Sequence, residues 1–168
     1  MLDVLRGMRQ KRRLAQYVYR VLVERSRAPE FFRDLGVPDT LDGRFDMMTL
    51  HAWLVLSWLK NKGAPEIAQR LTDMIFVGFD EGLRDLGAGD IGIGHRVKKM
   101  ANAFYGRLQV YGESQSTEAL AQSLTRNVYR DAAVDPANVT RLAHYVIAVK
   151  SHLAGCDLAM PFEFGPLP

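Results

Sequence analysis

Apolar residues recur at helical spacing along nearly the whole chain. Leu14, Val18, Val21 and Leu22, for example, stand at i, i+4, i+7 and i+8, so they form one stripe along a helix. The period-two alternation that marks a half-buried strand is almost absent. At 168 residues the chain is the size of one domain. The pattern therefore predicts an all-α, single-domain bundle of six to seven helices.

Capping and breaking residues set the expected helix bounds. The predicted helices cover residues 3–26, 29–35, 47–62, 65–86 and 93–111, a segment from 116 or 117 to about 128, and residues 136–155. Asp46, Asp90 and Asp135 are the expected N-caps of three of them, and Gly63 and Gly112 are expected ends. We divide the chain into a basic N-terminal helix (1–27) packed on the domain, a helical domain (28–156) and a tail (157–168) rich in Pro and Phe.

Two details of the pattern concern packing. The helix predicted over 47–62 is apolar all the way round, which is typical of a central helix. Its most hydrophobic run, Leu50–Leu59, is about half the length needed to span a bilayer, roughly 20 residues, so it predicts a buried helix. Gly78 and Gly82, four residues apart, suggest that a neighbouring backbone or bulky ring packs closely there.

Charge is distributed unevenly. Residues 1–27 hold eight Lys and Arg and two acids, a net charge of +6, so the rest of the chain carries −3 of the total +3. Such a basic element favours a polyanionic partner, RNA or an anionic lipid surface, although a merely solvated outer helix has the same pattern. The candidate ribosome- or membrane-contacting residues are Arg6, Arg9, Arg12, Arg13, Arg20 and Arg27.

Catalytic, metal and cofactor motifs are lacking. The single cysteine, Cys156, excludes an intrachain disulfide and a multi-thiolate metal site. The four histidines match no metal-binding spacing, and we expect buried His51 to hydrogen-bond a neighbour. The G-x-G-x-x-G match at 87–92 has no strand before it, so we interpret it as a connection between helices. We expect no secretory signal, because the N-terminal stretch is charged and has no uninterrupted apolar run. We predict no catalytic residue, no metal and no cofactor.

Four stretches of the sequence resemble a known family. They are FDMMTLHAWLVL (45–56), FDEGLRDLGAGDIGIG (79–94), VKKMANAFYGR (97–107) and RNVY (126–129). Together they resemble the ubiquinol–cytochrome c chaperone family, the assembly factors of the respiratory ubiquinol–cytochrome c reductase. The resemblance extends over most of the chain and is most specific over 45–112. Residues 76–78 (Phe-Val-Gly) lack acidic residues expected there, and the chain begins almost at the domain, so a bacterial-type member is expected.

The resemblance implies a non-enzymatic chaperone that binds newly made cytochrome b and promotes reductase assembly. Mitochondrial members sit near the ribosomal tunnel exit with a small partner, so the implied partners are cytochrome b, the tunnel exit or anionic lipid, and a small helical protein, with no DNA. The implied location is cytoplasmic, peripheral to the inner membrane, which corresponds to the matrix face in mitochondrial relatives. The implied client-contact residues are Asp80, Arg84, Asp90, Lys98, Lys99, Tyr105 and Arg107.

Binding an exposed apolar helix requires a groove, and methionine side chains repack easily in one. The tail residues Phe162 and Phe164 are candidates to cover that groove or to form part of it. Two other functions compete with this one. The first is an RNA- or ribosome-binding regulatory module that acts through the basic N-terminal helix. The second is an enzyme built on the cluster from Asp80 to Arg107, which requires a concave pocket with perturbed titrating groups there.

Overall fold

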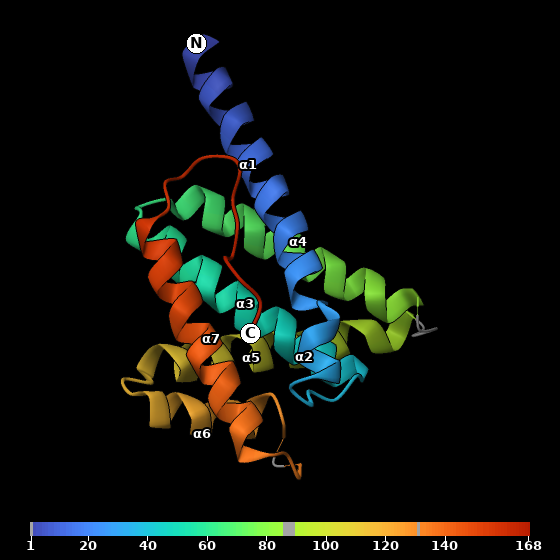
Figure 1. Cartoon of the computed structure of the whole chain (residues 1–168). Coiled ribbons are helices and arrows are strands. Elements are labelled where there is room, and N and C mark those ends of the chain that lie inside the picture. Colours follow the sequence, from blue (N-terminus) through green and yellow to red (C-terminus); the bar gives the residue numbers. More distant parts are fainter. Residues whose placement is uncertain (1, 86–89, 131) are drawn as a thin grey trace.

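The structure, a computed structural model, describes residues 2–85, 90–130 and 132–168. These residues form seven helices and no strand (Figure 1). The helices are α1 (Leu2–Ser26), α2 (Pro29–Arg33), α3 (Leu41–Asn61), α4 (Pro65–Asp85), α5 (Asp90–Glu113), α6 (Thr117–Asn127) and α7 (Pro136–Gly155). The predicted all-α fold with six to seven helices is confirmed.

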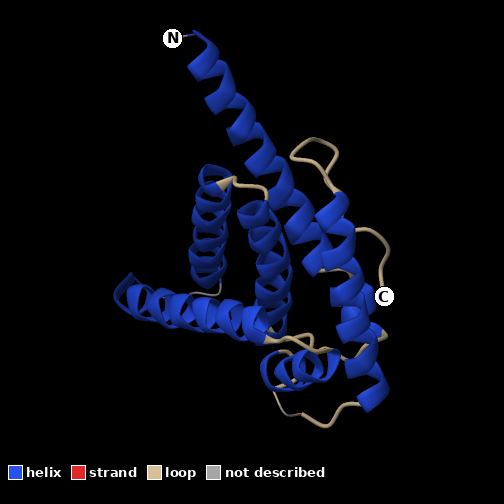
Figure 2. Ribbon diagram, turned by 90° about the vertical axis from the view of Figure 1, so that its left-hand side faces the viewer, coloured by secondary structure: helices blue, strands red, loops and turns tan. Residues whose placement is uncertain are grey.

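Helix α3 is the centre of the bundle. It packs against α1, α4, α5 and α7, while α6 packs against α5 and α7. Because α3 is enclosed on several sides, apolar residues all around it become buried, and the prediction of a central helix is confirmed. Helix α1 packs along α4 and α3, and its N-terminal end projects beyond the other helices in both views (Figures 1 and 2). No helix in the described part of the chain is long and apolar enough to cross a membrane.

Helix α3 begins six residues earlier than the sequence pattern predicts. The side-chain oxygen of Thr40 accepts a hydrogen bond from the Gly43 amide at 3.1 Å, so Thr40 is the N-cap. Residue 43 must be glycine here, since a Cβ would overlap the carbonyl oxygen of Pro38. The expectation that Asp46 caps this helix is wrong, because Asp46 lies within the helix and is fully buried.

The other capping signals mostly hold. Ser116 caps α6 and Asp135 caps α7, each by accepting a backbone hydrogen bond, at 3.1 and 2.9 Å. Gly63 ends α3 with φ +64°. Helix α5 continues through Gly112 to Glu113 instead of stopping at the glycine. Residues 86–89, which hold most of the glycine motif, lie outside the described residues. The side chain of Asp90 is also not described, so its predicted capping role stays a prediction.

The C-terminal tail is part of the core. Phe162 and Phe164 are buried, with their ring centroids 5.1 Å from Trp58 and 5.3 Å from His51, respectively. The Arg25 guanidinium donates hydrogen bonds to the backbone carbonyls of residues 165 and 166, at 2.6 and 3.2 Å. The tail therefore runs back beside α1, as Figure 1 shows, and it does not line the cavity described next.

Candidate functional site

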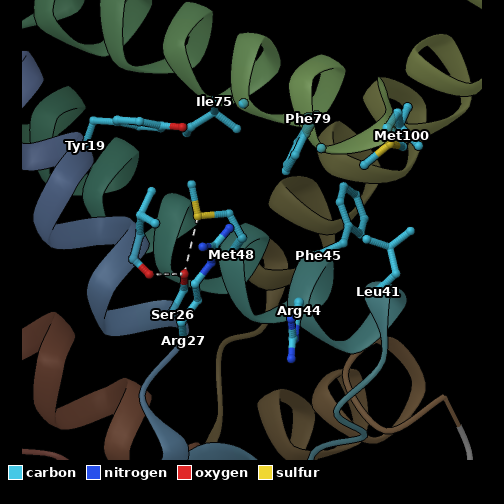
Figure 3. Close-up of a pocket in the computed structure, with 14 residues that line it drawn as sticks. Tyr19, Ser26, Arg27, Leu41, Arg44, Phe45, Met48, Ile75, Phe79 and Met100 are labelled. Carbon is cyan, nitrogen blue, oxygen red and sulfur yellow. Dashed lines mark hydrogen bonds between the residues drawn. The ribbon is translucent and has the colours of Figure 1, made fainter. Parts of the chain in front are cut away.

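A cavity of about 200 Å³ opens between α1, α3, α4 and α5 (Figure 3). Its walls are mainly aliphatic, aromatic and methionine side chains. The lining residues are Tyr19, Val23, Ser26, Arg27, Leu41, Arg44, Phe45, Met48, Ile75, Gly78, Phe79, Gly82, Leu83 and Met100.

Helical spacing explains how each wall forms. On α3, Phe45 and Met48 are three residues apart. On α4 the lining positions are 75, 78, 79, 82 and 83, which lie on one face of the helix. Gly78 lets the hydroxyl of Tyr19 approach the α4 backbone, because a Cβ at residue 78 would collide with it. The predicted close approach of a ring is confirmed at Gly78. It is wrong at Gly82, where a Cβ would meet nothing within 4 Å.

Aromatic rings and thioether groups make the cavity wall apolar and adaptable. The rings of Phe45 and Phe79, which both line it, are in tilted contact, with centroids 5.1 Å apart (Figure 3). Met48 lines the cavity from α3, and its sulfur lies 3.4 Å from the hydroxyl oxygen of Ser26 on α1, while Met100 lines the cavity from α5. Such polarisable, flexible side chains adapt to apolar groups of differing shape.

Cationic groups border the cavity. Arg27 and Arg44 are exposed and line it, and Arg44 pairs with Asp39 at 2.8 Å. Burial raises the pKa of Tyr19, with a further rise from Glu81, while Arg27 lowers it. Tyr19 is therefore neutral at physiological pH. The site suits an apolar group inserted past a positively charged edge.

Beside the cavity, a buried ion network fixes α3 against α5. The Asp46 carboxylate, fully buried, lies 2.9 Å from an Arg107 nitrogen and 2.8 Å from an Arg130 nitrogen. Burial raises the pKa of Asp46, and the two guanidinium groups hold that rise back. Arg130 also pairs with Asp42 at 3.1 Å, and the Arg107 guanidinium stands 5.4 Å from the Phe45 ring centroid. The network thus holds the α3 wall of the cavity in place.

A second buried polar pair lies on the other side of α3. The Nδ1–H of His51 donates to the Met47 carbonyl at 2.8 Å, so Nε2 accepts from the Tyr145 hydroxyl at 2.9 Å. The expectation that His51 hydrogen-bonds a neighbour is confirmed. Complete burial lowers the pKa of His51 to about 4, and burial raises the pKa of Tyr145 to about 12. No group of residues suited to a metal ion occurs in the described ranges.

This neutral histidine makes stability depend on pH. Between pH 6.5 and 4 the unfolded chain binds a proton at His51 that the folded chain does not, so stability falls as the pH drops through that window. We expect a loss of about 2 kcal/mol between pH 7.5 and 5 from this residue. Urea denaturation at the two pH values measures it. In His51→Asn the slope should flatten, whereas exposed His144→Asn should keep it; equal slopes in all three proteins would contradict the assignment.

The client-contact residues expected from the resemblance occupy different environments. On α4, Asp80 pairs with Arg84 at 2.9 Å near the surface. On α5, Lys98 and Lys99 are exposed and Tyr105 is 53% exposed. The Arg107 side chain is only 14% exposed and faces the Asp46 carboxylate. The candidate residues of the basic helix, namely Arg6, Arg9, Arg12, Arg13, Arg20 and Arg27, are all exposed.

Several residues of the site were missed in the sequence. Phe45 looks like an ordinary core position, because its period is the same as that of the buried face. Arg130 gives no periodic signal, since it lies after α6 with a φ of 54°. The signal available in the sequence was an acid at residue 46 inside an apolar run.

Comparisons with known proteins place this cavity in a known fold. A crystal structure described as that of the Cbp3 homolog from Brucella abortus is similar over 94% of this chain and 90% of that one, with a TM-score of 0.81 and 34% sequence identity. Ubiquinol-cytochrome-c reductase complex assembly factor 1 of Xenopus laevis is 26% identical over 153 residues, which are 87% of this chain and 76% of the relative.

Mammalian relatives match less of their own length. The proteins of the same name from mouse and human are each 25% identical to this chain, over 77% and 87% of it. The alignments span 45% and 51% of those relatives, so the chain matches about half their length. The family model described as ubiquinol-cytochrome C chaperone matches residues 33–160, which include α3 to α7 and every residue of α3, α4 and α5 that lines the cavity. The chain therefore belongs to the ubiquinol-cytochrome c chaperone family.

Proposed function

We propose that this protein is a non-enzymatic assembly chaperone that binds newly made cytochrome b and promotes assembly of ubiquinol–cytochrome c reductase. The observation that carries the proposal is the cavity lined by Phe45, Phe79, Met48 and Met100, within the part of the chain that matches the family. The walls are apolar and adaptable, which a protein needs to hold an exposed transmembrane segment.

The cavity's size favours a side chain over a metabolite. Its volume of about 200 Å³ is below the roughly 300–1,000 Å³ of typical small-molecule sites. One large apolar side chain of the client would enter it as an anchor, and the rest of the client segment would lie over the surrounding surface. Leu41, which is 53% exposed, provides apolar surface at the cavity. The arginines beside it suit the acidic or carbonyl-rich end of a client helix.

The remaining expectations follow from this role. The protein would act at the cytoplasmic face of the inner membrane. The half-buried Asp80 of α4 and the exposed Lys98, Lys99 and Tyr105 of α5 would extend the contact with the client or with a small helical partner. The alternative, an RNA- or ribosome-binding regulator, depends on α1 alone and makes no use of the cavity.

A photo-crosslinking amino acid at Leu41 tests the proposal in the native host. Leu41 lies at the cavity, so we expect a crosslink to cytochrome b while the reductase is being made. Ile147 on α7, 41% exposed and remote from the cavity lining, is the matched control and should give no such product. Crosslinked bands are identified by mass spectrometry.

Deletion of the gene provides the second arm. Assembled reductase, measured from the reduced b-type haem spectrum of membranes, should fall with its transcript and another respiratory complex unchanged. Normal reductase in the deletion strain, or a crosslink from Ile147 that equals the one from Leu41, would refute the proposal.

A further inference from the structure

Helix α1 carries a straight row of arginines that begins in its projecting N-terminal half (Figure 1). Arg6, Arg9, Arg13 and Arg20 are separated by three, four and seven residues, so they share one face of the helix over about 20 Å. That face is opposite the buried stripe of Leu14, Val18 and Leu22. All four arginines are exposed.

No ion pair within the described residues neutralises the charge on this row. Between residues 4 and 23 the chain has no acid, and Lys11, the one basic residue there that pairs, bonds to Glu66 of α4 on another side of the helix. Arg6, Arg9, Arg12 and Arg13 have no ion-pair partner among the residues that the structure describes. A line of like charges repels itself, so an external anion would relieve it.

An apolar residue is held next to this row. Leu158 and Met160 of the tail line a shallow depression together with Arg6, Arg9 and Arg13. Met160 is 55% exposed, although the tail on its C-terminal side is anchored by buried Phe162 and Phe164. The fold therefore presents a thioether side chain to solvent beside three arginines.

From these features we propose that the arginine row and Met160 form a docking surface for a bilayer that contains anionic phospholipid. The arginines would bind phosphate groups in the headgroup layer, and Met160 would enter the boundary between headgroups and acyl chains. This is the arrangement of an interfacial contact, in which a basic face and a small apolar element act together. The contact is independent of the cavity and of what the cavity binds.

The shape of the surface favours lipid over RNA. A straight row of charges on a convex helix matches a flat array of phosphates. Single-stranded RNA is usually bound with aromatic side chains stacked on its bases, and residues 6–13 contain no aromatic residue. The nearest aromatic residue in the sequence is Tyr17, and the Arg20 guanidinium already lies 5.2 Å from its ring centroid.

Vesicle flotation with the full-length protein tests the proposal. Vesicles of phosphatidylcholine with 30 mol% phosphatidylglycerol are compared with pure phosphatidylcholine at one fixed salt concentration. We expect binding to the anionic vesicles only. Arg6→Gln/Arg9→Gln/Arg13→Gln should weaken it about a hundredfold, since each basic residue near an anionic surface contributes about fivefold. Lys60→Gln/Arg126→Gln/Arg141→Gln removes equal charge from exposed positions elsewhere and should retain binding.

The apolar part of the contact has its own control. Met160→Ser should weaken vesicle binding severalfold, while Met8→Ser, at an exposed methionine on another side of α1, should not. Circular dichroism verifies that each variant is folded. Failure of the wild type to bind anionic vesicles, an equal loss in both charge variants, or binding to a structured RNA without binding to vesicles would each overturn the proposal.

Discussion

Replacing Asp46 by asparagine is expected to destabilise the protein by about 3 kcal/mol, because the change leaves buried positive charge without its counter-charge. Arg107 is 14% exposed and has Asp46 as its only ion-pair partner in the described part of the chain. Arg130 is 42% exposed and keeps Asp42, so the loss should lie at the lower end of the range for broken buried pairs. Urea denaturation at pH 7.5 measures it.

A surface pair serves as the control for this prediction. Asp80 and Arg84 are separated by 2.9 Å, much like the buried pair, yet their side chains are 37% and 52% exposed. Asp80→Asn should therefore change stability by no more than about 0.5 kcal/mol. If both variants lose the same small amount, the buried network does not hold α3 against α5 in the way the distances indicate.

Periodicity predicted the fold well because it records burial directly. Helix α3 is apolar all round and is central, and α7 shows heptad-like spacing and packs on α3 and α6. Local caps were also readable at Ser116 and Asp135, since each side chain bonds a backbone amide two or three residues ahead. In each cap the two bonded residues are neighbours in the sequence, so a local pattern is enough to predict the contact.

The site depends on contacts between distant segments, which a sequence alone does not encode. Asp46 has the residue type of a cap, but its partners stand 61 and 84 residues further along the chain, at Arg107 and Arg130. Gly78 and Gly82 look equivalent in the sequence. Only the packed structure shows that the first receives the Tyr19 hydroxyl and the second leaves open space in a cavity wall.

That open space provides the most selective test of the cavity's role. Gly82→Phe is expected to fill the cavity and abolish client binding while the protein stays folded. A Cβ at residue 82 meets no atom within 4 Å, and any residue other than proline raises helix propensity relative to glycine, so the fold should tolerate the change. Loss of one central anchoring contact typically weakens binding by 2 kcal/mol or more, which corresponds to about thirtyfold.

The readouts are the crosslink from Leu41 to cytochrome b and the b-type haem spectrum of host membranes. With Gly82→Phe both should fall to near the level of the deletion strain. Gly82→Ala is the matched control, because it adds one methyl group, stabilises the helix by up to about 1 kcal/mol and leaves most of the cavity open. Full reductase assembly with Gly82→Phe would show that the client is held elsewhere, and the exposed face of α4 and α5 around Asp80 and Tyr105 would then be the surface to test.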